Sequence, residues 1–151
     1  MSRRIKTKDG SVWWKVHPAI DAVQDVIIKA YSFEKAVAVV TSAKDGTHSQ
    51  HSAHHQLEKD PEPAWAIDLR IWNLFRAVAD KKKWWQRLYS FAGDLSIKLN
   101  DAAPKGFRFI VLLEDDHIHV EAYPEGGAPN LKGFKPLQTV YATEEVQGSM
   151  T

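Results

Sequence analysis

Six of the seven histidines in this chain lie in two short segments, and an aspartate stands between the two. The clustered residues are His48, His51, His54 and His55 in THSQHSAHH, Asp68 in AWAIDLR, and His117 and His119 in EDDHIHVE. Neutral imidazole and carboxylate bind zinc, and three such ligands leave a fourth position open for water. The clustering therefore predicts the chemistry of a metal-dependent hydrolase.

The composition limits which atoms can bind a metal and which class of partner we expect. The 151 residues include no cysteine, so the ligands must be nitrogen and oxygen atoms. A formal net charge of +1 provides no strong field for nucleic acid, and we expect no nucleic-acid partner. The length predicts a single domain over 1–151, with an ordered core over about 12–124 and a less ordered tail over about 125–151.

No segment has the pattern of a membrane anchor or a secretory signal. No apolar run approaches the ~20 residues that a transmembrane helix needs. The basic N-terminus lacks an apolar stretch and a cleavage site of small residues. We therefore expect a protein that is made in the cytoplasm without a signal peptide, and that reaches any extracellular substrate by another route. We also expect a monomer.

Hydrophobic periodicity predicts two helices and two pairs of strands. The expected helices are 18–32 and 83–99, and the expected strands are 36–41, 64–70, 107–113 and 117–123. A polar segment, 42–52, reads as a surface loop, and LEKDPEP (57–63) reads as an exposed excursion. This order predicts an α+β fold with a mostly antiparallel sheet and packed helices.

Alternation along the strands places the polar candidates on defined faces. In the strand 64–70, Asp68 lies on the face opposite Ile67 and Leu69. In the strand 117–123, one face carries His117, His119 and Glu121. We interpret Glu121 as a residue that neutralises surface charge. His54, Asp68 and His119 can then supply three metal ligands from three separate segments, with an acidic group near the attacking water.

These residues resemble a known family. SAHH, AWAIDLR and DHIHVE are similar in type and order to the zinc D-alanyl-D-alanine peptidase family, which includes phage endolysins and shares the zinc fold of the hedgehog signalling domain. That family carries Ser-x-His, then Asp, and later an acidic residue with His-x-His, and Ser52, His54, Asp68 and His119 match these elements. The resemblance covers roughly 17–123 and implies the same α+β fold.

The resemblance also implies a role for each residue. His54, Asp68 and His119 would be the Zn²⁺ ligands. Asp116, three positions before His119, would be the catalytic base, with Glu114 as the alternative because a hairpin turn can bring either group over the metal. His117 would stabilise the oxyanion of the tetrahedral intermediate by donating a hydrogen bond.

Two departures from the family pattern bear on the substrate. Thirteen residues separate His54 from Asp68, where the family has six, and LEKDPEP looks like an insertion between the two ligand segments. The upstream arginine that grips a terminal carboxylate in the carboxypeptidase members is absent, and Ala43 and Lys44 occupy that region. An internal peptide bond is therefore a better expected target than a free D-alanine terminus.

The expected function is a zinc metallopeptidase that hydrolyses peptidoglycan stem peptides or cross-links, at a D-Ala or an L-Ala–D-Glu bond. Cell-wall degradation by a bacteriophage endolysin is the context that the resemblance implies. One alternative is a non-catalytic zinc-binding domain that binds a partner. Another is an iron oxygenase, although its histidine and carboxylate ligands usually stand one residue apart.

Overall fold

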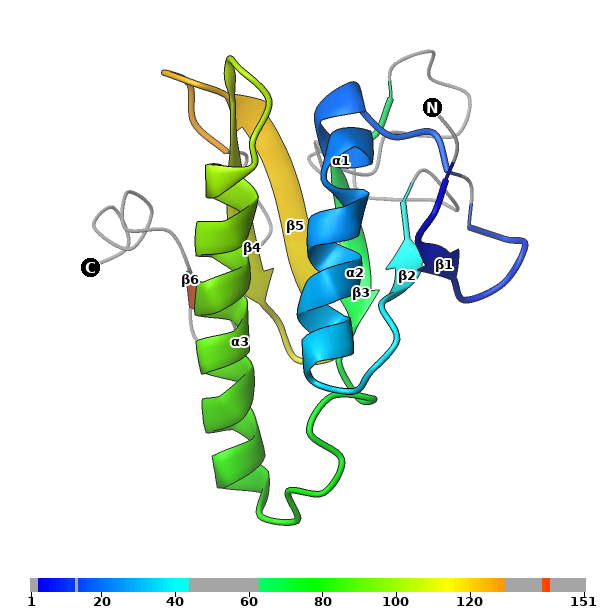
Figure 1. The fold of residues 1–151 in the computed structure, drawn as a ribbon, viewed down its shortest axis with the longest axis vertical. Coiled ribbons are helices and arrows are strands. Elements are labelled where there is room, and N and C mark those ends of the chain that lie inside the picture. The colour runs from blue at the N-terminus through cyan, green and yellow to red at the C-terminus, as the bar shows by residue number, and fades with distance from the viewer. Residues whose placement is uncertain (1–2, 13, 44–62, 130–139, 142–151) are drawn as a thin grey trace.

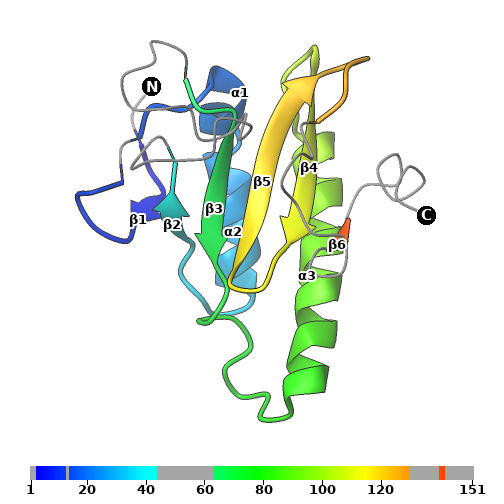
Figure 2. The ribbon, with the colours of Figure 1, turned by 180° about the vertical axis from the view of Figure 1, so that it is seen from behind.

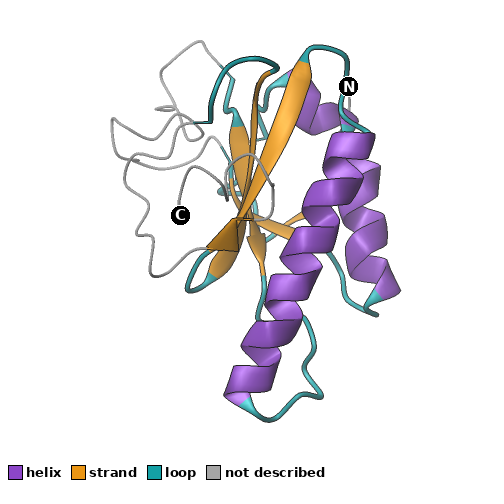
Figure 3. Ribbon diagram, turned by 90° about the vertical axis from the view of Figure 1, so that its left-hand side faces the viewer, coloured by secondary structure: helices purple, strands orange, loops and turns teal. Residues whose placement is uncertain are grey.

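One mixed sheet forms the centre of the fold, and the helices cover one of its faces (Figures 1 and 3). The computed structural model describes residues 3–12, 14–43, 63–129 and 140–141. The strands follow one another across the sheet in the order β1-β2-β3-β5-β4-β6. Their bounds are β1 Lys6–Thr7, β2 Val39–Ser42, β3 Ala66–Arg70, β4 Phe107–Leu113, β5 His117–Pro124 and β6 Val140–Tyr141.

The sheet is antiparallel except at one edge. β1 pairs with β2 in parallel, whereas the pairs β2–β3, β3–β5, β4–β5 and β4–β6 are antiparallel. The predicted α+β class with a mostly antiparallel sheet is therefore confirmed. The prediction for β4 is correct to the residue, and β5 extends one residue beyond its prediction. The strands β1 and β6, of two residues each, were not predicted.

The first predicted helix consists of two consecutive helices. α1 spans Pro18–Ala22 and α2 spans Gln24–Phe33. Val23, with φ −106° and ψ 13°, leaves helical geometry and separates them. His17 caps α1 because its Nδ1 accepts a hydrogen bond from the Ala19 N–H at 3.0 Å, and Pro18 follows in the first turn, where it has no N–H to leave unpaired.

The second predicted helix, α3, is longer than expected and lies against β4. It spans Lys81–Asp101, and the Asp80 side chain caps it by accepting from the Lys83 N–H at 2.9 Å. Near its C-terminus, the Asn100 side chain accepts from the Phe109 N–H at 2.9 Å and donates to the Phe109 carbonyl at 3.0 Å. This two-way contact fixes β4, and so the turn that follows it, relative to the helix layer.

The hydrophobic core lies between the helices and one face of the sheet. The strands contribute Ile67, Leu69, Phe109, Val111, Ile118 and Val120, and the helices contribute Ile27, Tyr31, Leu88, Leu95 and Leu99. Burial of one such side chain stabilises a fold by about 1.5–3 kcal/mol. Because the alternation along β3 and β5 is strict, this packing directs Asp68 and His119 to the opposite face, as the sequence predicted.

In the part of the chain that the structure describes, no helix has both the length and the apolar character needed to cross a bilayer.

Candidate metal centre

β3 and β5 lie side by side in the sheet (Figure 2), and their register places Asp68 directly opposite His119. Both side chains project from the face that the helices leave uncovered. The Asp68 Oδ1 lies 3.2 Å from the His119 Nδ1. The register therefore brings together two of the three predicted metal ligands, from positions 51 residues apart in the sequence.

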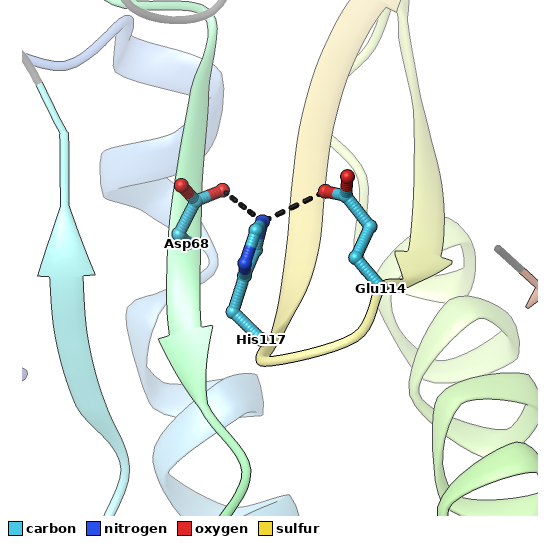
Figure 4. A group of neighbouring side chains, drawn as sticks. All are labelled: Asp68, Glu114 and His117. Carbon is cyan, nitrogen blue, oxygen red and sulfur yellow. Dashed lines mark ion pairs between the residues drawn. The ribbon is translucent and has the colours of Figure 1, made fainter. Parts of the chain in front are cut away.

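The turn between β4 and β5 adds two further side chains to the same place. The Glu114 N–H donates to the His117 carbonyl at 2.9 Å, which closes the turn. Glu114 Oε2 then lies 2.7 Å from the Nε2 of His117, and the same Nε2 lies 3.3 Å from Asp68 Oδ1. Figure 4 shows the His117 ring between the two carboxylates.

Asp116 lies on the other side of the His117 ring. Its Oδ1 contacts the Nδ1 of His117 at 2.5 Å, and 86% of its side chain is exposed. The two nitrogens of an imidazole point away from each other. The Asp116 carboxylate is therefore held on the solvent side of the ring, whereas Glu114 is on the side that faces Asp68.

Glu121 is part of the buried cluster, which corrects its interpretation as a surface residue. It is 2% exposed, and its Oε1 lies 3.0 Å from the Nε2 of His119. His119 is fully buried and contacts a carboxylate at each ring nitrogen. The alternation that places Glu121 on the same face as His119 is visible in the sequence, but burial of this face is not.

The carboxylates favour the protonated form of both imidazoles. Burial lowers the pKa of His117, but its hydrogen bond to Glu114 and the charge of Asp68 outweigh this effect and raise the pKa to about 9. Burial also lowers the pKa of His119, and its hydrogen bonds to Asp68 and Glu121 raise it to about 9. Among the described residues, two imidazoles thus contact four carboxylates.

Part of the cluster is close enough together to hold a metal ion. Tetrahedral zinc with bonds of about 2.0–2.1 Å separates its ligand atoms by about 3.3–3.4 Å. The distance of 3.2 Å between the Asp68 Oδ1 and the His119 Nδ1, which belong to two predicted ligands, is close to that separation. Ligand atoms of Asp68, Glu114 and His117 lie within 4.8 Å of one another, close enough to hold an ion, and this set shares only Asp68 with the predicted ligands.

Not every predicted site residue can be placed. Asp68, Glu114, His117 and His119 come together, and Asp116 lies at their outer edge. The predicted ligand His54 lies outside the described residues, as do His48, His51, His55, Ser52 and the predicted excursion up to residue 62. The described residues of the centre therefore all come from β3, β5 and the β4–β5 turn.

No family model, no curated protein and no solved structure matches this chain.

Proposed function

We propose that the chain is a zinc-dependent peptidase, and that it hydrolyses peptidoglycan stem peptides or cross-links. The observation that carries the proposal is the juxtaposition of Asp68 and His119 at 3.2 Å, with the Glu114–His117 pair beside them on the same face of the sheet. A pair of metal ligands next to an acid and an imidazole is the set of groups that metal-assisted amide hydrolysis requires. The resemblance to the zinc D-alanyl-D-alanine peptidases gives the substrate class.

In the proposed enzyme, Asp68 and His119 are metal ligands, together with His54 from the residues that the structure does not describe. Asp68 supplies a carboxylate oxygen and His119 supplies its Nδ1. When bound, Zn²⁺ would polarise the substrate carbonyl and lower the pKa of water. The remaining residues of the cluster then have separate tasks.

Glu114 is the better-placed base of the two acidic candidates. Its carboxylate lies on the side of His117 that faces Asp68, and 21% of its side chain is exposed. In this position Glu114 can take a proton from the attacking water and pass it to the leaving amine. Asp116 contacts the opposite ring nitrogen, so its task in the proposed enzyme is to orient His117.

His117 can stabilise the charge that develops on the carbonyl oxygen. Its Nε2 lies between Asp68 and Glu114, and 23% of its side chain is exposed, so a substrate can reach it. Because the carboxylates favour a protonated ring, this nitrogen carries a proton that it can donate to the oxyanion. Asp116 at Nδ1 keeps the ring in the required orientation.

A digestion experiment tests the proposal. The protein, loaded with one equivalent of zinc, is incubated with purified peptidoglycan, and the soluble products are identified by mass spectrometry. We expect stem-peptide fragments that are absent after chelation and absent with Asp68→Asn. A protein that binds zinc and releases no fragment would instead be the non-catalytic zinc-binding domain, and the proposed peptidase activity would be wrong.

A further inference from the structure

The buried carboxylate of Glu121 has no task in the mechanism described above, although it contacts a proposed metal ligand. We infer that Glu121 is a positioning residue that holds His119 in the one tautomer able to bind the metal through Nδ1. This inference rests on the proposed zinc site. It concerns the affinity for the metal and does not depend on which peptide bond is cleaved.

A carboxylate at position 121 needs a hydrogen-bond partner, because its neighbours in the sheet are apolar. Its neighbours across β3 and β4 are Ala66 and Ile110, which are both fully buried. A carboxylate that is buried among apolar side chains is costly unless hydrogen bonds compensate for the lost water. The His119 Nε2, at 3.0 Å from Glu121 Oε1, supplies one such bond.

The geometry assigns different tasks to the two carboxylates at His119. Asp68 contacts Nδ1 and Glu121 contacts Nε2, so the ring separates them. When the Nε2 proton is donated to Glu121, a neutral His119 must keep its lone pair on Nδ1, on the side where Asp68 lies. A histidine ligand commonly donates its other N–H to a carboxylate, and this contact fixes the ring and raises the basicity of the ligand.

Side-chain packing alone would not fix the tautomer of His119. His119 and Glu121 are two positions apart on β5, so their side chains are neighbours on one face of the strand. A hydrophobic residue at position 121 could fill the same space between Ala66 and Ile110. It would leave the Nε2 N–H of His119 without this acceptor, and the proton could then move to Nδ1, where it competes with the metal.

The test measures zinc affinity by competition with a chromophoric chelator. Glu121→Leu removes the acceptor, and Glu121→Gln keeps an acceptor without the charge. We expect the Kd for zinc to rise by about 10–100-fold in Glu121→Leu, the usual range for such an outer residue, and by less in Glu121→Gln. Glu125→Gln, at an exposed position beyond β5, is the matched control and should leave the Kd unchanged.

Two further readouts separate positioning from a merely structural role. Circular dichroism of the metal-free variants establishes that each is folded at the temperature of the titration. Long-range ¹H–¹⁵N correlation spectra of the zinc-loaded wild type should show His119 bound through Nδ1 and protonated at Nε2. An unchanged zinc Kd in a folded Glu121→Leu protein would overturn the inference, and so would zinc bound at Nε2.

These outcomes can be told apart from a failure of the proposed function. A wild-type protein that binds zinc through His119 but cleaves no stem peptide contradicts the peptidase and leaves the role of Glu121 intact. An active zinc peptidase whose affinity for the metal does not respond to Glu121→Leu contradicts the role of Glu121 alone.

Discussion

The two histidines of β5 both contact carboxylates but lie in different surroundings. His119 is fully buried between Asp68 and Glu121, and both partners come from strands. His117 is partly exposed and contacts Glu114 and Asp116 from the β4–β5 turn, as well as Asp68 at 3.3 Å. A metal ligand needs a fixed ring, whereas a group that contacts substrate needs access. This difference in burial is the basis on which the proposed function takes His119 as the metal ligand and His117 as the group that acts on the substrate.

The largest effect is expected on the exposed side of the cluster, at Glu114. Glu114→Gln keeps the shape of the side chain and removes the base, so kcat should fall by about 10²–10⁴-fold. The zinc Kd should stay close to that of the wild type. Steady-state hydrolysis of a purified stem peptide by the zinc-loaded proteins measures the effect.

Asp116→Asn is the matched comparison for this variant. Since Asp116 only contacts the outer nitrogen of His117, its loss should reduce kcat by much less than the loss of Glu114. If Asp116→Asn were the more damaging change, the assignment of the base would be reversed.

The next effect distinguishes the two histidines by metal affinity. His119→Ala removes a proposed ligand, and we expect the zinc Kd to rise by more than the roughly 100-fold that an outer residue can cause. His117→Ala should change the Kd far less and should lower kcat, because it removes the donor to the oxyanion. Isothermal titration with zinc, together with kinetics at saturating metal, measures both. Equal losses of affinity in the two variants would remove the distinction between them.

A smaller effect is expected on the stability of the metal-free protein as the pH changes. Both imidazoles have a folded pKa of about 9, raised from 6.5. Their contribution to stability is therefore fully present below pH 6.5 and is lost as the pH rises through about 9. The Tm of the metal-free protein should fall over this window, as scanning calorimetry can show. A Tm that rises over the same window would contradict the ion pairs between the two imidazoles and their carboxylates.

The smallest expected effect lies in the helix layer, away from the cluster. The Tyr31 hydroxyl donates to the Arg70 carbonyl at 2.6 Å, and Tyr31 is fully buried. Tyr31→Phe should reduce the free energy of unfolding in urea by about 1–3 kcal/mol, because the carbonyl loses its donor. The zinc Kd should not change. A large loss of zinc affinity would show that the helix layer takes part in the site.

Much of the arrangement can be predicted from the sequence because strand alternation is a strong constraint. The alternation of Ile67 and Leu69 with Asp68 predicts which face carries the carboxylate, and the same pattern in β5 predicts the face of His119. The register that sets these two residues opposite each other cannot be obtained from either strand alone. It is fixed by packing of the whole sheet against the helices.

The less predictable features depend on local geometry. The break at Val23 interrupts a continuous apolar stripe, so periodicity alone indicates a single helix. The choice between Asp116 and Glu114 depends on how the turn orients each side chain. Sequence spacing from His119 favours Asp116, and it does not show that Asp116 and Glu114 contact different nitrogens of the His117 ring. The burial of Glu121 is not predicted, because a charged residue on a polar face is usually exposed.

The division between the two histidines is tested most directly by crystallography of the zinc-loaded protein, with anomalous diffraction at the zinc edge. The account predicts one zinc peak about 2.0–2.1 Å from both the His119 Nδ1 and the Asp68 carboxylate. Glu114 and His117 should lie beside the ion without binding it, and Glu121 should remain at the His119 Nε2. A zinc ion bound by Glu114 and His117 in place of His119, or no zinc at this face of the sheet, would contradict the account.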